Sequence, residues 1–419
     1  MLSQVLSLFL SHKFGIIKCN ERKVRHTYRL RPGAEAKRWL HFEANNCRYL
    51  WNRLVEGVQK SNWYSDKDLT AWRKELAWLR AGSSMVQQQL FRDFKTAKGR
   101  KKFKSSHGYL PSLNYVGFGK NFHIREGKLC LPHGVKIPVV WSRELPSDPS
   151  SVRVSQDNLG HWYASFVVEV PEQTNHWAPD NSQIGIDWGL RALATTTDET
   201  FDLEHPEFAK QAHKNMVRYQ RMMARRAPKP GKKASNGYKQ AKRVVAKQHK
   251  KIARQRQDHG RKWVRKVVDN HQQIAIENLK PCFMFGSNLA RKAGDAGLGN
   301  LKKDLIFAAE LAGREMVLVH PKNSSITCSE CSARNKQNVS AKHKRFRCIS
   351  CGFETDRDLN AARNILDTAG RRACSSGASL TAGFNRASEP QAQQLVSRPV
   401  SLTVKGKTDV QAELGIPFL

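Results

Sequence analysis

Residues 328–364 read CSECSARNKQNVSAKHKRFRCISCGFETDRDLNAARN. Cys328 and Cys331 form one C-x-x-C pair, Cys348 and Cys351 form another, and sixteen residues separate the two pairs. Each pair at this spacing presents two thiolates to one tetrahedral ion, so the stretch predicts a structural zinc ribbon holding one Zn²⁺. The basic loop KHKRFR inside it could contact a phosphate backbone. A structural ribbon alone does not explain the acidic helix start, DRDLNAARN, that follows directly.

Three carboxylates suggest what this helix start belongs to. Asp187 ends an apolar strand in IGIDWGL, Glu277 ends another in IAIENL, and Asp358 lies in DRDLNAARN. An isolated acid at a strand end is more often a cap or an ion-pair partner. Together the three match the cluster of hard oxygen ligands that two-metal phosphodiester hydrolysis needs. The sequence therefore predicts a nuclease centre, with the ribbon inserted immediately before its third acid.

The charge of the chain points to a polyanionic partner. Among 419 residues, 72 are Lys or Arg and 36 are Asp or Glu, which gives a net charge of +36. Such a surplus favours nucleic acid, because each neutralised phosphate releases counterions. The basic helical stretches of 209–269 could be a solvated face, but their charge density favours contact with a polyanion. A membrane surface is the alternative, and we expect no membrane partner because no long apolar span stands out.

The chain divides into successive segments with different predicted secondary structure. A strand is predicted over 23–32, helices from about 34 to 100, and short alternating strands between 105 and 170 that predict a small β-barrel. The last two strands predict a hairpin turning at Asp157–Gly160. An α/β domain opens at Ile184. The first eighteen residues lack the features of a signal peptide, and the paired C-x-x-C cysteines indicate a reducing cytoplasm rather than a disulfide framework.

The motifs GIDWGL, IENL, the two C-x-x-C pairs and DRDLNAARNI, in this order, resemble the RuvC-like nuclease domain of the TnpB (OrfB) family. This family consists of transposon-encoded RNA-guided DNA endonucleases, similar to the nucleases that gave rise to compact type V CRISPR effectors. YRLRP, CRYLWN, GKLCLP, RQDHGRKW and DAGLG extend the resemblance to roughly residues 23–385. The sequence departs from the family pattern in HPKNSSITC, which carries Ile326, and at Ser332, where Gly is usual. Neither departure removes a ligand or an acid.

The resemblance implies an α/β fold plus a β-barrel: an RNase H-like (RuvC) nuclease domain with an inserted four-Cys zinc ribbon, preceded by a wedge-like barrel with an inserted helical recognition bundle. The implied boundaries are 1–22 for an N-terminal extension, 23–35 for the first barrel strand, 36–104 for the helical recognition domain, 105–172 for the rest of the barrel, 173–325 for RuvC parts I and II, 326–355 for the zinc-ribbon insert that binds target nucleic acid, 356–372 for RuvC part III and 373–419 for a loosely ordered tail.

The resemblance also implies roles for individual residues. The RuvC triad that holds two Mg²⁺ ions falls on Asp187, Glu277 and Asp358, the last chosen over Asp356 because the family's acid stands two positions before Asn. Zn²⁺ falls on the four cysteines. CRYLWN places Tyr49, Trp51 and Asn52 near a target-adjacent DNA motif, although these side chains could equally be the buried face of a helix. The nucleic-acid contacts expected on the basic helix are Lys242, Arg243, Lys250, Lys251 and Arg254.

The implied function is an Mg²⁺-dependent RNA-guided DNA endonuclease that binds a guide RNA and cuts both strands of double-stranded target DNA with one site. It would act in a prokaryotic cytoplasm on nucleoid DNA, as a monomer or as a dimer on one RNA. Alternatives are a compact type V CRISPR effector with an array-derived guide, and a guided repressor that binds without cutting, against which the intact triad argues. The ribbon argues against a DNA-joining transposase, and a zinc-ribbon RNA-binding protein would leave the acids unexplained.

Overall fold

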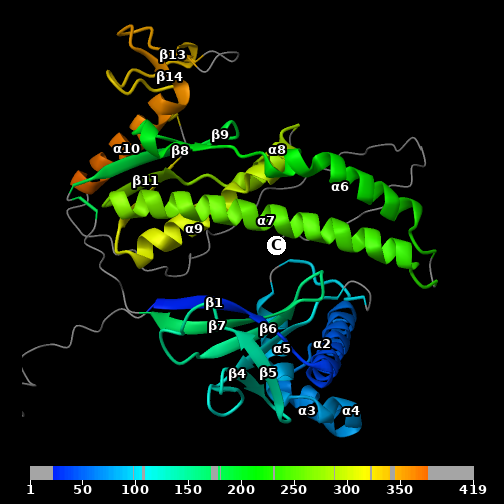
Figure 1. Cartoon of the computed structure of the whole chain (residues 1–419). Helices are drawn as coiled ribbons and strands as arrows, with labels where there is room; N and C mark the ends of the chain where they lie inside the picture. Colours follow the sequence, from blue (N-terminus) through cyan, green and yellow to red (C-terminus); the bar gives the residue numbers. More distant parts are fainter. Residues whose placement is uncertain are drawn as a thin grey trace, which may run out of the picture. The chain divides into compact units, whose positions relative to one another are not determined.

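A computed structural model describes residues 22–97, 99–105, 109–170, 178–179, 181–229, 232–286, 288–320, 323–339 and 345–375 (Figure 1). The expected N-terminal extension, apart from its last residue, lies outside these ranges, and so does the expected tail beyond residue 375. Part of the KHKRFR loop, residues 342–344, also lies outside them.

The first sheet of the described chain is antiparallel and has seven strands in the order β2-β6-β7-β1-β5-β4-β3. Their bounds are β1 (Arg22–Leu30), β2 (Ser112–Val116), β3 (His123–Arg125), β4 (Lys128–Leu131), β5 (Val135–Val140), β6 (Ser151–Gln156) and β7 (Trp162–Val170). Every second residue of β7 is buried, as expected for a strand with one face on a core. The sheet curls (Figure 1), but in the described residues β2 and β3 are unpaired edges, so the predicted barrel is open.

Four helices lie between β1 and β2: α2 (Ala34–Gln59), α3 (Asp66–Glu75), α4 (Ala77–Ala81) and α5 (Ser84–Thr96). A capping box starts α3, in which Ser65 and Asp68 satisfy each other's backbone N–H groups. Leu40 and Leu50 of α2 and Phe91 of α5 belong to the same hydrophobic core as the buried face of the sheet. The helices and the first sheet are therefore stabilised by one core.

The second sheet of the described chain has five strands in the order β10-β9-β8-β11-β12. Their bounds are β8 (Gln183–Trp188), β9 (Ala192–Thr196), β10 (Leu203–Glu204), β11 (Gln273–Glu277) and β12 (Glu315–Val319). Strands β10, β9 and β8 pair antiparallel, whereas β11 pairs parallel to both β8 and β12. Parallel neighbours bring the carboxyl ends of β8 and β11 to the same edge of the sheet.

Helices cover both faces of this sheet (Figure 1). The helices of this part are α6 (Phe208–Arg225), α7 (Asn236–Asn270), α8 (Ala290–Ala296), α9 (Leu298–Leu311) and α10 (Arg357–Ser375), with 3-10 turns η1 (Glu199–Phe201), η2 (Pro281–Gly286) and η3 (Lys336–Asn338). Helices α7 and α9 pack on the face that carries Ile186 and Ile276. Helix α10 packs on the other face, so closely that a Cβ on Gly185 would lie 2.3 Å from the carbonyl oxygen of Ala362.

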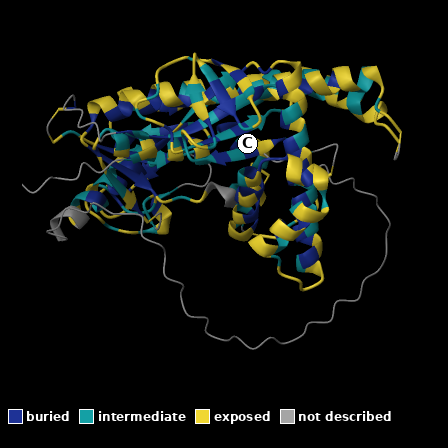
Figure 2. Ribbon diagram, turned by 90° about the horizontal axis from the view of Figure 1, so that it is seen from below, coloured by how far each residue is buried: buried dark blue, intermediate teal, exposed yellow. Residues whose placement is uncertain are grey.

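Two long basic helices are largely exposed. No residue of α6 is buried, and α7 buries a single stripe that includes Val264 and Val267. Figure 2 shows the same contrast across the molecule, with buried residues in the strands and exposed residues along the outer sides of the helices. None of the helices in the described ranges combines the length and apolar character needed to cross a bilayer.

Candidate functional site

The second sheet places two of the predicted acids on one face. Ile186 and Ile276 are paired partners and point into the core beneath α7 and α9. Successive side chains of a strand alternate between faces, so the next residues, Asp187 and Glu277, point to the opposite face, where α10 packs. Both strands end within a residue of these acids. Local strand geometry therefore brings the two carboxylates together.

The third acid, Asp358, lies in the first turn of α10. The neighbouring Asp356 has a different position: its Oδ1 accepts the backbone N–H groups of Asp358 and Leu359 at 2.8 and 3.4 Å, as a helix N-cap does. The Arg357 guanidinium donates to Asp358 Oδ1 at 3.0 Å. Asp356 is thus engaged in starting the helix, and Asp358 is the acid of DRD whose negative charge acts on Asp187.

Asp187 lies near enough to Glu277 and Asp358 for their negative charges to affect its pKa. Burial raises the pKa of Asp187 well above its ordinary value, and the negative charges of Glu277 and Asp358 raise this pKa further. The Arg357 guanidinium and the Trp188 N–H act in the opposite direction. Carboxylate oxygens are hard ligands with negative charge, so the chemistry of these three acids suits Mg²⁺.

Two residues that sequence reasoning missed lie beside Glu277, whose exposed fraction is 6%. Ser324 Oγ donates to Glu277 Oε1 at 2.6 Å. Lys302 of α9 donates to Asn278 Oδ1 at 3.0 Å and to the Leu279 carbonyl at 3.2 Å. Burial lowers the pKa of Lys302, and the negative charge of Glu277 partly offsets this effect. No motif signals either residue, because both meet the strand end from distant parts of the chain.

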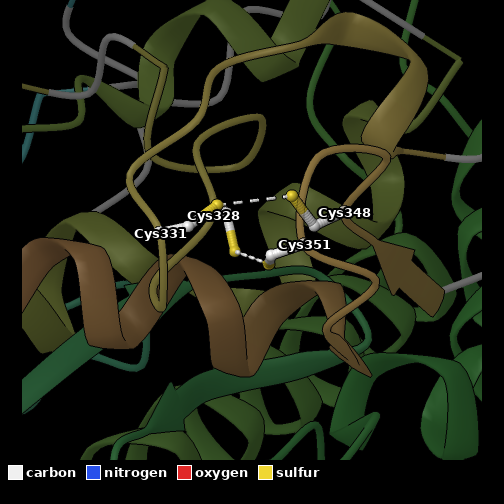
Figure 3. Close-up of side chains that lie close together, drawn as sticks. All are labelled: Cys328, Cys331, Cys348 and Cys351. Atoms are coloured by element: carbon white, nitrogen blue, oxygen red, sulfur yellow. Dashed lines mark hydrogen bonds between the residues drawn. The ribbon is translucent and has the colours of Figure 1, made fainter.

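The four predicted cysteines also converge (Figure 3). Their sulfur atoms all lie within 4.8 Å of one another, and Cys328 Sγ lies 3.8 Å from Cys351 Sγ while Cys331 Sγ lies 3.6 Å from Cys348 Sγ. Cys328 and Cys348 are buried. A backbone N–H from Cys351 lowers the pKa of the Cys348 thiol to about 6. Four sulfurs at this spacing fit a tetrahedral Zn²⁺ ion.

The two C-x-x-C turns repeat the same backbone geometry. The N–H of Ser332 donates to the Cys328 carbonyl, and the N–H of Gly352 donates to the Cys348 carbonyl, both at 3.0 Å. Both residues are left-handed, with φ of +59° for Ser332 and +73° for Gly352. Strand β13 (Arg345–Arg347) leads into the second turn and pairs antiparallel with strand β14 (Glu354–Asp356), which leads from this turn into α10.

The predicted contacts on α7 divide into two groups. Lys242, Arg243, Lys251 and Arg254 are exposed and make no ion pair with any residue that the structure describes. Lys250 is half-buried instead. Its Nζ donates to Asp157 Oδ2 at 2.5 Å and to the Tyr163 hydroxyl at 2.6 Å, both in the β6–β7 hairpin. In this conformation Lys250 is engaged by the protein itself.

The residues from CRYLWN also have partners within the protein. Trp51 Nε1 donates to the Lys102 carbonyl at 2.9 Å, and the Asn52 side chain bonds both the N–H and the carbonyl of Lys104. Lys104 Nζ lies 3.6 Å from the centre of the Trp51 ring. Tyr49 accepts a hydrogen bond from Arg53 and stacks edge-on against Trp78. Trp51 and Asn52 therefore fasten a basic segment to α2.

Comparison with known proteins gives two family matches. Residues 165–287 match the OrfB_IS605 family, described as a probable transposase, and residues 299–365 match the Cas12f1-like TNB domain. A solved complex of Cas12f1 with guide RNA and target DNA is 13% identical, covers 83% of this chain and 99% of its own, and has a TM-score of 0.49.

Two bacterial relatives provisionally named as RNA-guided DNA endonucleases are similar over most of the chain. The protein from Streptomyces pristinaespiralis is 31% identical, covering 81% of this chain and 87% of its own length. InsQ of Escherichia coli K12 is 28% identical, covering 87% and 96%. Identity at this level across nearly the whole of both chains establishes that this chain belongs to the TnpB (OrfB) family.

Proposed function

We propose that this protein is an RNA-guided DNA endonuclease that cuts both strands of its target with one carboxylate centre. The observations that support the proposal are that Asp187 and Glu277 point to the face of the second sheet on which α10 packs, and that the charge of Asp358, at the start of α10, raises the pKa of Asp187. A purely structural role does not account for the placement of Asp187, because burial and the negative charges of Glu277 and Asp358 raise its pKa, and such repulsion costs stability. Membership in a family with relatives named as such endonucleases supports the same reading.

The fold that we propose for residues 183–375 is RNase H-like, of the RuvC type. Three antiparallel strands followed by two parallel ones, with the acids at the ends of the first and fourth strands in chain order, support this assignment. The four-cysteine unit is proposed as a zinc ribbon inserted before α10. The curled first sheet with α2–α5 is proposed as the wedge and the recognition bundle.

The proposed chemistry is phosphodiester hydrolysis. Two Mg²⁺ ions, when bound, would supply the charge that activates water and stabilises the leaving 3′ oxygen. Asp187 would hold the ions, and the negative charges of both other acids already act on it. Glu277 and Asp358 would complete the ligand set from either side. The chain would position the phosphate with its own cations, and we propose Lys302, which is affected by the charge of Glu277, and Arg357, which pairs with Asp358, for this role.

The partners that we propose are a guide RNA and double-stranded DNA carrying a short adjacent motif. The exposed side chains Lys242, Arg243, Lys251 and Arg254 of α7 would contact the phosphates of a guide–target duplex, which is read by shape and not by sequence. The basic segment fastened by Trp51 and Asn52 would face DNA near the adjacent motif.

The first prediction tests the carboxylate centre with isosteric variants. Three variants each replace one acid by its amide: Asp187→Asn, Glu277→Gln and Asp358→Asn. Each should abolish cleavage of a plasmid library with randomised flanks, because each removes a charged ligand. Binding of the co-purifying RNA should remain. Glu204→Gln, an exposed acid on β10 of the same sheet, is the control and should cleave normally. Cleavage by Asp187→Asn at a comparable rate would remove Asp187 from the centre.

The same preparation separates the alternatives. Sequencing the bound RNA identifies its source: RNA from a transposon end supports the proposal, whereas an RNA built from repeat and spacer identifies a CRISPR effector. RNA binding without any Mg²⁺-dependent cutting by the unmodified chain would identify a guided binder and refute the proposed activity.

A further inference from the structure

The loop that leads from β12 into the four-cysteine unit also contacts the carboxylate centre. Ser324, in this loop, donates its hydroxyl to Glu277 Oε1 at 2.6 Å across 47 residues of sequence. The Ser324 carbonyl in turn accepts a hydrogen bond from Asn364 Nδ2 of α10 at 2.8 Å. One short residue thus joins the end of β11 to the helix that carries Asp358.

Two asparagines on α10 hold the rest of this loop. Asn364 Nδ2 also donates to the Thr327 carbonyl at 2.7 Å, as does Asn360 Nδ2 at the same distance. Asn360 Oδ1 accepts the N–H of Ser329, the residue after Cys328. The two asparagines are one helical turn apart and buried, with exposed fractions of 0% and 7%. They therefore anchor the entrance of the cysteine unit on the nuclease helix.

We propose that Ser324 is a positioning residue for Glu277 and that the asparagine pair on α10 fixes Ser324, so that anchoring of the cysteine unit sets the geometry of the carboxylate. The inference rests on the proposed function and adds a residue to it. It also gives a structural reason why the cysteine unit leads directly into α10. This helix carries Asp358, and its two asparagines bind the loop that leads from β12 into the cysteine unit.

The hydrogen bond from Ser324 restrains one oxygen of the Glu277 carboxylate, Oε1, so Glu277 would meet a metal ion with its side chain already held in place. Partners that hold a ligating carboxylate in place are commonly worth about 10–100-fold in metal affinity. A hydroxyl is suited to this task because it donates without adding charge to an already repulsive cluster.

The test compares three single variants of the protein loaded with its guide RNA. Ser324→Ala removes the hydroxyl, Ser324→Thr keeps it, and Ser325→Ala is the matched control, an exposed serine next in the same loop. Mn²⁺ binding is measured by electron paramagnetic resonance without DNA, and cleavage is measured against Mg²⁺ concentration. Melting temperature and zinc content are recorded for each variant.

Ser324→Ala should weaken Mn²⁺ binding about 10–100-fold and raise the Mg²⁺ concentration for half-maximal cleavage in parallel. Ser324→Thr should restore both, and Ser325→Ala should change neither. The melting temperature, the zinc content and RNA binding should stay near those of the unmodified chain. A general structural defect would change them. Unchanged Mn²⁺ binding by Ser324→Ala, or an equal loss in Ser325→Ala, would overturn the inference.

A second measurement tests the route through Asn364. Asn364→Ala should weaken Mn²⁺ binding, and combining it with Ser324→Ala should add little, because both changes release the same carboxylate. If the two losses of Mn²⁺ binding added up in the double variant, Asn364 would not act through Ser324. Failure of the proposed function would give a different result. The unmodified chain would not cleave DNA, and any Mn²⁺ binding would be the same in the Asp187→Asn variant.

Discussion

At the scale of single residues, Ser332 is the clearest local departure from an ideal sequence. It occupies a left-handed turn with φ of +59°, whereas the equivalent turn uses Gly352 at +73°. An L-residue with a side chain pays about 1 kcal/mol or more for this conformation, and glycine does not. Ser332→Gly should therefore stabilise the folded cysteine unit by about 1 kcal/mol.

Zinc release to a chelator measures this effect. The Ser332→Gly variant should lose zinc more slowly than the unmodified chain, and Gly352→Ser, the reciprocal change, should lose it faster. Faster release from Ser332→Gly would show that the serine side chain makes a favourable interaction that outweighs the backbone cost.

The strand-end positions of Asp187 and Glu277 and the grouping of the four cysteines were accessible from the sequence because local rules determine them. Spacing of two residues brings two thiolates to one turn, and an acid at the end of an apolar strand lies at the edge of its sheet. Ser324 was not accessible, since its contact with Glu277 depends on how α10 and the loop after β12 meet across 47 residues. Lys302 was missed for the same reason.

At the scale of elements, the buried Glu43 makes helix α2 sensitive to pH. Its side chain has an exposed fraction of 0%, Oε1 accepts the Ser83 N–H at 2.6 Å, and Oε2 has no partner among the described residues. Burial raises the pKa of Glu43 from 4.5 to about 7, against the opposing effects of the Ser83 N–H and Arg73. The folded chain therefore holds a proton at pH values where the unfolded chain has released it.

The sign of the pH dependence follows from this proton. The stabilising contribution is complete below about pH 4.5 and is lost as the pH rises through about 7, by up to about 3 kcal/mol. Glu43→Gln, which keeps the acceptor for Ser83, should remove this dependence. Melting temperatures measured from about pH 5 to about pH 8 should fall more steeply for the unmodified chain than for the variant. Parallel curves would show that Glu43 titrates normally.

Several elements followed from periodicity, and others did not. Alternation predicted the β6–β7 hairpin correctly, and the turn is held by Asp157 Oδ1, which accepts the N–H groups of Leu159 and His161. Closure of the first sheet was not predictable, because it depends on whether the two edge strands meet and not on the pattern within any strand. The role of the aromatic residues on α2 could not be decided from the sequence, because holding a loop and contacting DNA use the same side-chain chemistry.

At the scale of the whole molecule, the net charge of +36 predicts strongly salt-dependent binding of nucleic acid. Composition gives this charge but not which cations are available to phosphates. The structure separates adjacent residues of α7: Lys251 is exposed, whereas Lys250 is held by Asp157 and Tyr163. The two lysines should therefore respond differently to the same substitution.

Lys251→Ala should weaken guide RNA binding at low salt and reduce the slope of log affinity against log salt by about 1, because one phosphate contact is lost. Its melting temperature should not change.

Lys250→Ala should instead lower the melting temperature, since Asp157 would remain half-buried without its cation, and should leave the salt slope nearly unchanged. Fluorescence anisotropy over a series of salt concentrations, with thermal melting in the same buffers, measures both quantities. A reduced slope for Lys250→Ala would mean that RNA displaces Asp157 from this lysine, and that the contact between α7 and the β6–β7 hairpin opens when the guide binds.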